Sequence, residues 1–225
     1  MKVRFLVAST CRQQKQQFKK QHMEKLERKN VYKVYDKIGH WFAENRHSVL
    51  EEKAYLDEVL KKLPLNASVL DLGCGSGKPI LEYLLSMKVK VLGIDASTQM
   101  LEIAKANFPD TRFIQKDMRK LDLDEKFDAI IAWHSFFHLP VADQPGMFSI
   151  FGRHLNPNGV LLFTSGTERG EAWGMNGGEN IFHASLAVAE YHQLLEENNF
   201  EVLTHKVNDP ECGGANVWLA QYKPR

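Results

Sequence analysis

The sequence predicts an α/β fold in which a mostly parallel sheet is covered by helices on both faces. Three observations predict it. Short β-branched runs alternate with helical patterns along most of the chain. Residues 129–132 are apolar throughout, as expected of a strand that is buried on both faces. Residues 200–207 and 216–222 are separated by a turn with Pro and Gly, which predicts an antiparallel hairpin closing the sheet.

Two helices are predicted at the start of the body. Residues 30–45 form an aromatic-rich helical pattern. A second helix is predicted from Ser48, because Ser48 and Glu51 have the spacing of a capping box, and Pro64 ends it.

Five strands are then predicted from apolar runs at residues 69–72, 89–94, 111–115, 127–132 and 160–164. Helical patterns separate most of these strands or follow them, at residues 80–86, 97–107, 146–155 and 187–198. With the closing hairpin, the sheet has seven strands. Residues 165–184 carry five of the fifteen glycines and no periodicity. We expect a long loop there, either a lid or binding loop or a plain surface insertion.

The chain divides into a basic arm (residues 1–29) and a domain (residues 30–225). A length of 225 residues suits one domain. Residues 1–30 hold nine Lys or Arg and two Glu, a net charge of +7, so the remainder carries −6. We expect the arm to be a disordered or helical extension. One alternative is that the arm binds RNA or anionic lipid. Another is that translation starts at Met23.

Composition excludes several classes of protein. With 44% hydrophobic and 25% charged residues, the chain is neither disordered nor fibrous. No apolar run approaches the roughly 20 residues of a membrane-spanning helix. The acidic body argues against a broad nucleic-acid surface. Cys11, Cys74 and Cys212 have no paired or metal-like spacing, which suits a reducing cytoplasm. We expect a monomer or homodimer.

Residues 69–77, VLDLGCGSG, predict a ligand-binding turn between a strand and a helix. Glycines at 73, 75 and 77 allow the backbone to approach a ligand, and the helix start offers unpaired amides. The spacing G-x-G-x-G differs from the dinucleotide pattern G-x-G-x-x-G and from the phosphate loop G-x-x-x-x-G-K-[ST]. A nicotinamide oxidoreductase or a nucleotide hydrolase therefore fits poorly.

Carboxylates end the next two predicted strands. Asp95 follows Gly73 by 22 residues and can accept hydrogen bonds from both hydroxyls of a ribose. Asp117 could accept from an adenine amine, with Met118 beside the ring, or it could simply be a turn or helix-capping residue.

These motifs resemble the class I S-adenosylmethionine-dependent methyltransferases, in their small-molecule branch. VLDLGCGSG resembles the first motif of that family, and GIDAS, QKDM, FDAIIAWHSFFHL and LNPNGVLLFTSG resemble its later motifs in the usual order. The resemblance spans about residues 31–222. It implies a Rossmann-like fold, S-adenosyl-L-methionine as cofactor and S-adenosyl-L-homocysteine as product.

The resemblance also implies roles for particular residues. Gly73, Cys74 and Gly75 would line the methionine part of the cofactor, Gly77 would support the glycine turn, and Asp71 would anchor that turn. Asp95 would bind the ribose, and Trp133 would lie near the sulfonium. The adenine would be contacted by Ala96, Met100, Asp117 and Met118. Tyr35, Trp41 and Arg46 match a YDxxxxWxxxxR helix that often covers the cofactor, although Tyr35 and Trp41 could equally be core residues.

His134 and His138 are the predicted catalytic residues, because a neutral histidine can take a proton from the acceptor. His183 is a third candidate, and structural roles are the alternative for all three. No metal site is expected, since no third ligand accompanies the i, i+4 pair.

Residues 133–136 read WHSF, so the D/N-P-P-Y/F/W motif of amino-group nucleic-acid methyltransferases is missing. This favours a small-molecule substrate. An RNA- or protein-directed methyltransferase and a non-catalytic cofactor-binding module are the alternatives.

Overall fold

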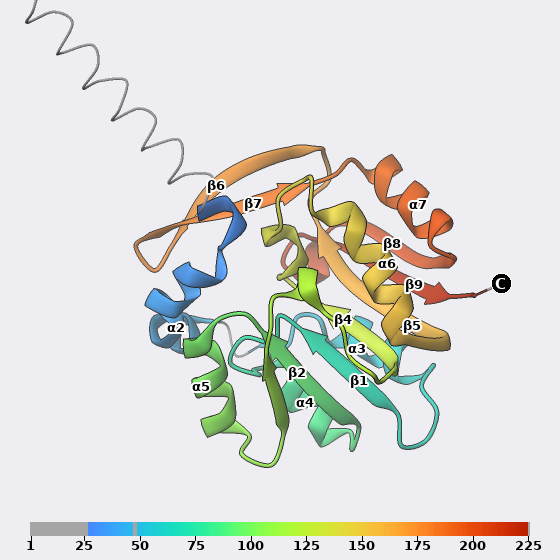
Figure 1. Cartoon of the computed structure of the whole chain (residues 1–225), viewed down its shortest axis with the longest axis horizontal. Coiled ribbons are helices and arrows are strands. Elements are labelled where there is room, and N and C mark those ends of the chain that lie inside the picture. Colours follow the sequence, from blue (N-terminus) through green and yellow to red (C-terminus); the bar gives the residue numbers. More distant parts are fainter. Residues whose placement is uncertain (1–26, 47–48, 225) are drawn as a thin grey trace, which may run out of the picture.

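The computed structural model describes residues 27–46 and 49–224. They form a seven-stranded sheet with the strand order β3-β2-β1-β4-β5-β9-β8 and a separate two-stranded sheet (Figure 1). Five strands are parallel, as predicted: β1 Ser68–Leu72, β2 Lys90–Asp95, β3 Arg112–Gln115, β4 Phe127–Ala132 and β5 Leu155–Ser165. Strand β9 (Ala215–Tyr222) runs antiparallel to β5 and to β8 (Phe200–Asp209), which confirms the predicted closing hairpin.

Helices cover both faces of the sheet because the side chains of each strand alternate between two cores. On β1, Leu70 and Leu72 pack with α6 (Gln144–His154) and α7 (Val188–Glu197). Val69 faces the other way, towards α3 (Lys53–Leu60) and α4 (Ile80–Ser86). The predicted Rossmann-like architecture is therefore confirmed.

Helix α2 (Tyr32–Asn45) packs beside α5 (Thr98–Asn107), near the start of the sequence that the structure describes. Ser97 caps α5, since its hydroxyl accepts a hydrogen bond from the Met100 amide. Because Ser97 also donates to Asp36 of α2, at 2.8 Å, the cap ties the two helices together.

The predicted start of the second helix is wrong. Helix α3 begins at Lys53, whereas Glu51 lies in a turn and Glu52 is buried in an ion pair with Arg46. Ser48, the other half of the predicted capping box, lies outside the described residues, as do residues 1–26 of the basic arm. The last residues of the arm do contact the domain: Arg28 pairs with Glu171 at 2.7 Å.

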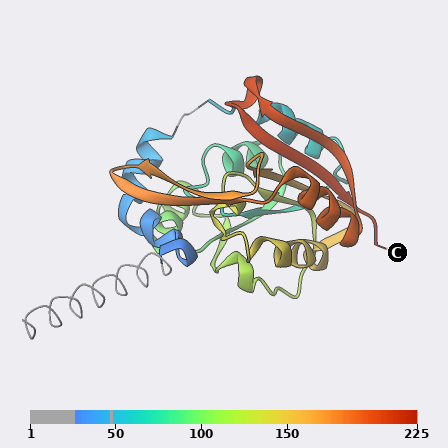
Figure 2. The same ribbon diagram turned by 90° about the horizontal axis from the view of Figure 1, so that it is seen from above.

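The expectation of a long loop at residues 165–184 is also wrong. Residues Gly170–Asn176 and Glu179–Ser185 form an antiparallel hairpin, β6–β7. Its two-residue turn consists of Gly177 (φ +55°) and Gly178 (φ +81°), both left-handed as a tight hairpin turn requires. Seen from above, the hairpin extends away from the main sheet to lie beside α2 (Figure 2).

None of the described helices is long and apolar enough to cross a membrane.

Candidate active site

A cavity of about 530 Å³ opens at the carboxyl ends of the parallel strands. Residues that directly follow β1, β2, β3 and β4 line it, and this edge is where open α/β sheets bind ligands. The volume is within the usual range for small-molecule sites. Helix α2 and the β6–β7 hairpin complete the walls.

The glycine turn after β1 forms one wall. The amides of Gly73 and Cys74 donate to the Ile94 carbonyl oxygen at 2.7 and 3.0 Å. Gly73 has φ +84°, and a Cβ atom there would lie 2.2 Å from Cβ of Ser135. Only glycine therefore suits this position. The Ser135 hydroxyl donates to the Leu72 carbonyl oxygen, so the turn and the segment after β4 are fixed against each other.

Asp95 lies at the end of β2 and stabilises the same turn. Its Oδ2 accepts a hydrogen bond from the Gly75 amide at 2.9 Å, and its Oδ1 accepts from the Ser97 amide at 2.8 Å. Burial raises the pKa of Asp95, although these amides oppose the shift. Each carboxylate oxygen can accept a further hydrogen bond, so Asp95 remains able to bind a ligand hydroxyl.

Asp117 follows β3 and has the helix-capping role that the sequence left open. It accepts from the Arg119 amide at the start of the 3-10 helix η1 (Met118–Lys120) and pairs with the Arg119 guanidinium. Although burial acts to raise it, the hydrogen bonds from Arg119 lower the pKa of Asp117 overall. Arg119 also pairs with Asp143 at 2.8 Å. We call this region of the cavity, which comprises the glycine turn after β1, the lining residues from Asp95 to Arg119 and the adjoining Lys29, the aspartate end.

Four residues predicted for the site do not line the cavity: Cys74, Gly77, Asp71 and Trp41. Cys74 is buried, with its sulfur beside Gly93 of β2, and burial raises the pKa of its thiol. Gly77 packs against Phe108 and supports the turn from behind. Asp71 is the predicted anchor of the turn; the hydrogen bonds that the structure shows at the turn run to Asp95 and to the Ile94 carbonyl oxygen. Asp71 lies on the same face of β1 as Val69, and burial raises its pKa to about 7.

The other predicted residues do line the cavity: Tyr35, Arg46, Gly73, Gly75, Asp95, Ala96, Met100, Asp117, Met118, Trp133, His134 and His138. His183 lines it too. Trp41 does not; it is 43% exposed and lies beside Gly177 of the hairpin turn.

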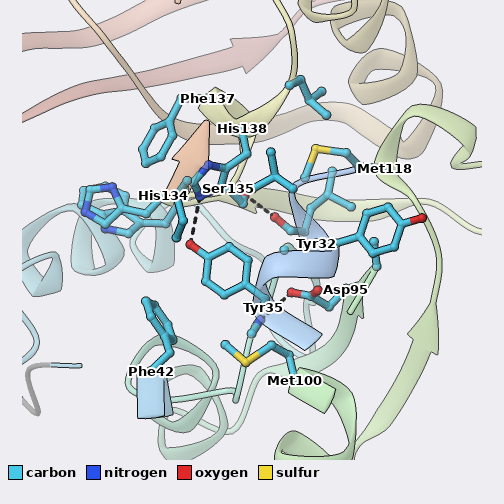
Figure 3. A pocket seen from close by; sticks show the side chains of 18 of the residues that line it. Tyr32, Tyr35, Phe42, Asp95, Met100, Met118, His134, Ser135, Phe137 and His138 are labelled. Carbon is cyan, nitrogen blue, oxygen red and sulfur yellow. Dashed lines mark hydrogen bonds between the residues drawn. The ribbon is translucent and has the colours of Figure 1, made fainter. Parts of the chain in front are cut away.

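Opposite the aspartate end, Tyr35 of α2 points towards His138 of the 3-10 helix η2 (Phe136–His138) (Figure 3). The Tyr35 hydroxyl lies 3.0 Å from His138 Nε2, and His138 Nδ1 lies 2.9 Å from the Phe182 carbonyl oxygen of β7. A carbonyl can only accept, so Nδ1 carries the proton and Nε2 accepts from Tyr35. Burial lowers the pKa of His138 to about 3, so the ring is neutral. His138 of η2 thus links α2 and β7 through its two hydrogen bonds.

His134 has a different environment. It follows β4 with φ +49°, a left-handed conformation uncommon outside glycine, and its side chain is exposed to the cavity. Its amide donates to Thr164 Oγ1 at 2.9 Å, and its Nδ1 lies 3.4 Å from the same oxygen. Nε2 has no hydrogen-bond partner within residues 27–46 and 49–224. Burial, with Arg46 and His183, lowers the pKa of His134 to about 4.

Phe137 brings the three histidine rings together. Its ring centroid lies 5.6 Å from that of His134, 4.9 Å from that of His138 and 5.4 Å from that of His183. We call Tyr35, His134, Phe137, His138 and His183 the histidine end. The described residues contain no cluster of histidine, cysteine and carboxylate groups suited to a metal ion, so the three histidines do not form one.

Sequence reasoning missed the contribution of the hairpin. Gly174, Met175, Asn176 and Ile181 line the cavity. The Asn-Gly-Gly sequence at the hairpin turn could have revealed it, because such turns join adjacent antiparallel strands. Tyr32, Phe42 and Ser135 were also missed, and no motif distinguishes them from core residues.

The fold and this cavity define an α/β protein that binds its ligand at the carboxyl edge of the sheet. A family profile described as a methyltransferase domain matches residues 69–159. The solved structure of S-adenosylmethionine-bound CalS10, an amino pentose methyltransferase from Micromonospora echinaspora, is similar with a TM-score of 0.65. It is 18% identical and covers 86% of this chain and 97% of its own.

Curated relatives support the same assignment to a methyltransferase domain. The trans-aconitate 2-methyltransferase of Escherichia coli O157:H7 is 30% identical over 170 residues, which are 69% of this chain and 66% of that protein. Protein 235L of Invertebrate iridescent virus 6 is 37% identical over 94 residues, 40% of this chain and 33% of the viral protein. This chain therefore spans two thirds or less of these relatives. Residues 69–159 therefore form a methyltransferase domain, and the fold is that of the S-adenosylmethionine-dependent methyltransferases, whose cofactor is S-adenosylmethionine.

Proposed function

We propose that this protein transfers a methyl group from S-adenosylmethionine to a small-molecule acceptor. One observation carries the proposal: a single cavity joins the glycine turn and Asp95 to the histidine end. A bound nucleoside at the aspartate end and an acceptor at the histidine end would therefore share one enclosed space.

The residues of the aspartate end suit the cofactor. Gly73 and Gly75 have left-handed φ angles and leave their part of the wall without side chains, so a ligand can approach the backbone. Asp95 has lone pairs free for the two ribose hydroxyls. Ala96, Met100 and Met118 offer apolar surface for the adenine, and Trp133 continues that surface towards the histidines.

When bound, S-adenosylmethionine supplies a methyl group activated by its positively charged sulfur. The protein's own part is to align the acceptor with that methyl group and to keep water out. Holding two reactants in attack geometry can supply roughly 7–11 kcal/mol. His134 is the proposed proton acceptor, since it lines the cavity, its Nε2 has no hydrogen-bond partner among the described residues, and its ring is neutral.

A small acceptor fits the enclosure better than a macromolecule. The β6–β7 hairpin lies over the histidine end and contacts α2, so the cavity has walls on several sides. Two of the similar proteins are named for small-molecule substrates, trans-aconitate and an amino pentose, and they support the same class of substrate for this chain. We also propose a reducing cytoplasmic location, which Cys74 and Cys212 support because both are free thiols.

Calorimetric titration tests the cofactor part of the proposal. We expect S-adenosylmethionine and S-adenosylhomocysteine to bind with micromolar affinity and NAD not to bind. Incubation with radiolabelled S-adenosylmethionine and a small-molecule extract tests transfer, and a labelled small product is expected. Cofactor binding with no labelled product would favour the non-catalytic binding module. Binding of NAD alone would contradict the proposal.

A further inference from the structure

The charges around the histidine end point to the kind of acceptor it receives. Arg46 is the one cationic side chain among the described residues that line this region; Lys29, Lys116 and Arg119 belong to the aspartate end. Arg46 Nη2 already lies 3.1 Å from Glu52 Oε1, in a pair that is largely buried. The one cation of this region within residues 27–46 and 49–224 is thus already paired with a carboxylate.

Acidic groups outnumber Arg46. Glu51 and Glu52 line the cavity. Asp71 lies just behind it; burial raises its pKa to about 7 although the nearby Arg46 opposes the rise, so Asp71 adds only part of a negative charge near neutral pH. A carboxylate acceptor entering this region would lose its hydration without gaining a free cation, and it would meet like charges. An uncharged acceptor meets neither penalty.

The remaining polar groups are neutral hydrogen-bonding groups. Tyr35 and His138 satisfy each other, and the other nitrogen of His138 is occupied by the Phe182 carbonyl. His134 Nε2, which has no hydrogen-bond partner among the described residues, is available to an acceptor in this region, and the rings of Trp133 and Phe137 lie 5.3 and 5.6 Å from the His134 ring, centroid to centroid.

We infer that the acceptor is an uncharged small molecule whose nucleophile is a hydroxyl or an amine that carries a proton, and that His134 accepts this proton. The inference rests on the proposed function and specifies its substrate class. It sets this chain apart from the relative that is named for the polycarboxylate trans-aconitate.

The chemistry balances without a further reactant. The lone pair of the acceptor oxygen or nitrogen forms the new bond to the methyl carbon. The bond between sulfur and that carbon breaks, and its electron pair stays on sulfur, which becomes neutral. In the tautomer with Nδ1 protonated and donating to Thr164 Oγ1, Nε2 of His134 has a free lone pair, and the proton of the nucleophile moves to it and then to solvent. A carboxylate nucleophile carries no proton, so methyl transfer to it would need no proton acceptor at His134.

The first test measures binding and does not depend on turnover. The protein saturated with S-adenosylhomocysteine is titrated calorimetrically with trans-aconitate. We expect no heat of binding up to millimolar concentrations. Binding that is lost in Arg46→Ala would overturn the inference, because it would show that Arg46 is free to hold a carboxylate.

The second test identifies the bond that is made. Labelled product from S-adenosylmethionine and a small-molecule extract is treated with mild alkali, which releases methyl esters as volatile methanol but leaves methyl ethers and methylamines intact. We expect the label to stay non-volatile. Release as methanol would identify a carboxylate acceptor and refute the inference. Failure to form any product would count against methyl transfer itself, so the two failures are distinct.

The third test concerns His134. His134→Gln should lower kcat about 10²–10⁴-fold and leave the affinity for S-adenosylhomocysteine unchanged. Added imidazole should restore part of the rate. His40→Gln is the matched control, since His40 is an exposed residue of α2 outside the cavity and should retain the wild-type rate. Equal kcat values for both variants, or loss of cofactor affinity in His134→Gln, would show that His134 is not the proton acceptor.

Discussion

The two ends of the cavity are built in different ways. At the aspartate end, Asp95 and Asp117 lie at or shortly after the end of a strand, and their hydrogen bonds join residues 2 to 20 apart, as Asp117 does with Arg119 and Asp95 with Gly75. At the histidine end, the Tyr35–His138 hydrogen bond joins residues 103 apart and the His138–Phe182 bond joins residues 44 apart. Local motifs therefore encode the first end, whereas tertiary packing assembles the second.

This difference predicts that the aspartate end is sensitive to single backbone changes. Gly73→Val should abolish binding of S-adenosylmethionine, since a Cβ atom would lie 2.2 Å from Ser135 Cβ and φ is +84°. Calorimetry measures the loss, and circular dichroism reports whether the variant is folded.

Gly146→Ala is the control for that change. Gly146 lies in α6, and a Cβ atom there meets nothing within 4 Å, so binding should be unchanged. Wild-type affinity in Gly73→Val would contradict the assignment of this turn to the cofactor.

The histidine end should instead be sensitive to acid. The folded-state pKa of His138 is about 3, below its unfolded value of 6.5, so the unfolded chain binds more protons between these values. Its contribution to stability is complete above about pH 6.5 and is lost as the pH falls towards 3. His134, His183 and Tyr35 surround His138, and the two histidines act in the same direction.

Urea unfolding across this pH range measures the effect, which we expect to be on the order of a few kcal/mol. His138→Leu should flatten the profile, and His40→Leu, at an exposed site, should not. An unchanged slope in His138→Leu would show that another group is responsible.

Asp95 tests how far the aspartate end depends on one carboxylate. Asp95→Ala should weaken cofactor binding by roughly 1–3 kcal/mol, because it removes the hydrogen-bond acceptor for the ribose hydroxyls and leaves the Gly75 amide unpaired. Asp110→Ala, at an exposed site away from the cavity, should have no effect. Equal affinities in a calorimetric comparison of the two variants would remove Asp95 from the cofactor site.

Tyr35→Phe should have the smallest effect. It leaves His138 Nε2 without its donor, which should lower the free energy of unfolding by about 1 kcal/mol. Tyr32→Phe is the control, because Tyr32 also lines the cavity and its hydroxyl has no hydrogen-bond partner within the described ranges. Thermal unfolding that shifts equally in both variants would mean that the Tyr35–His138 bond does not stabilise the histidine end.

The same contrast explains what the sequence could predict. The parallel strands and the glycine turn are recognisable because their signals are local: apolar runs, glycine spacing and a carboxylate at the end of a strand. The hairpin at residues 165–184 was predicted as a loop because its glycines obscured the strand pattern, although they supply the left-handed turn at Gly177 and Gly178. The partner of His138 could not be predicted, since it depends on how α2 and β7 pack together.

A crystal structure of the protein with S-adenosylhomocysteine tests the central claim most directly. We expect the ribose hydroxyls within hydrogen-bond distance of Asp95 and the sulfur directed towards His134, with open space between the sulfur and Nε2. A nucleoside bound elsewhere, or a sulfur facing away from the three histidine rings, would contradict it.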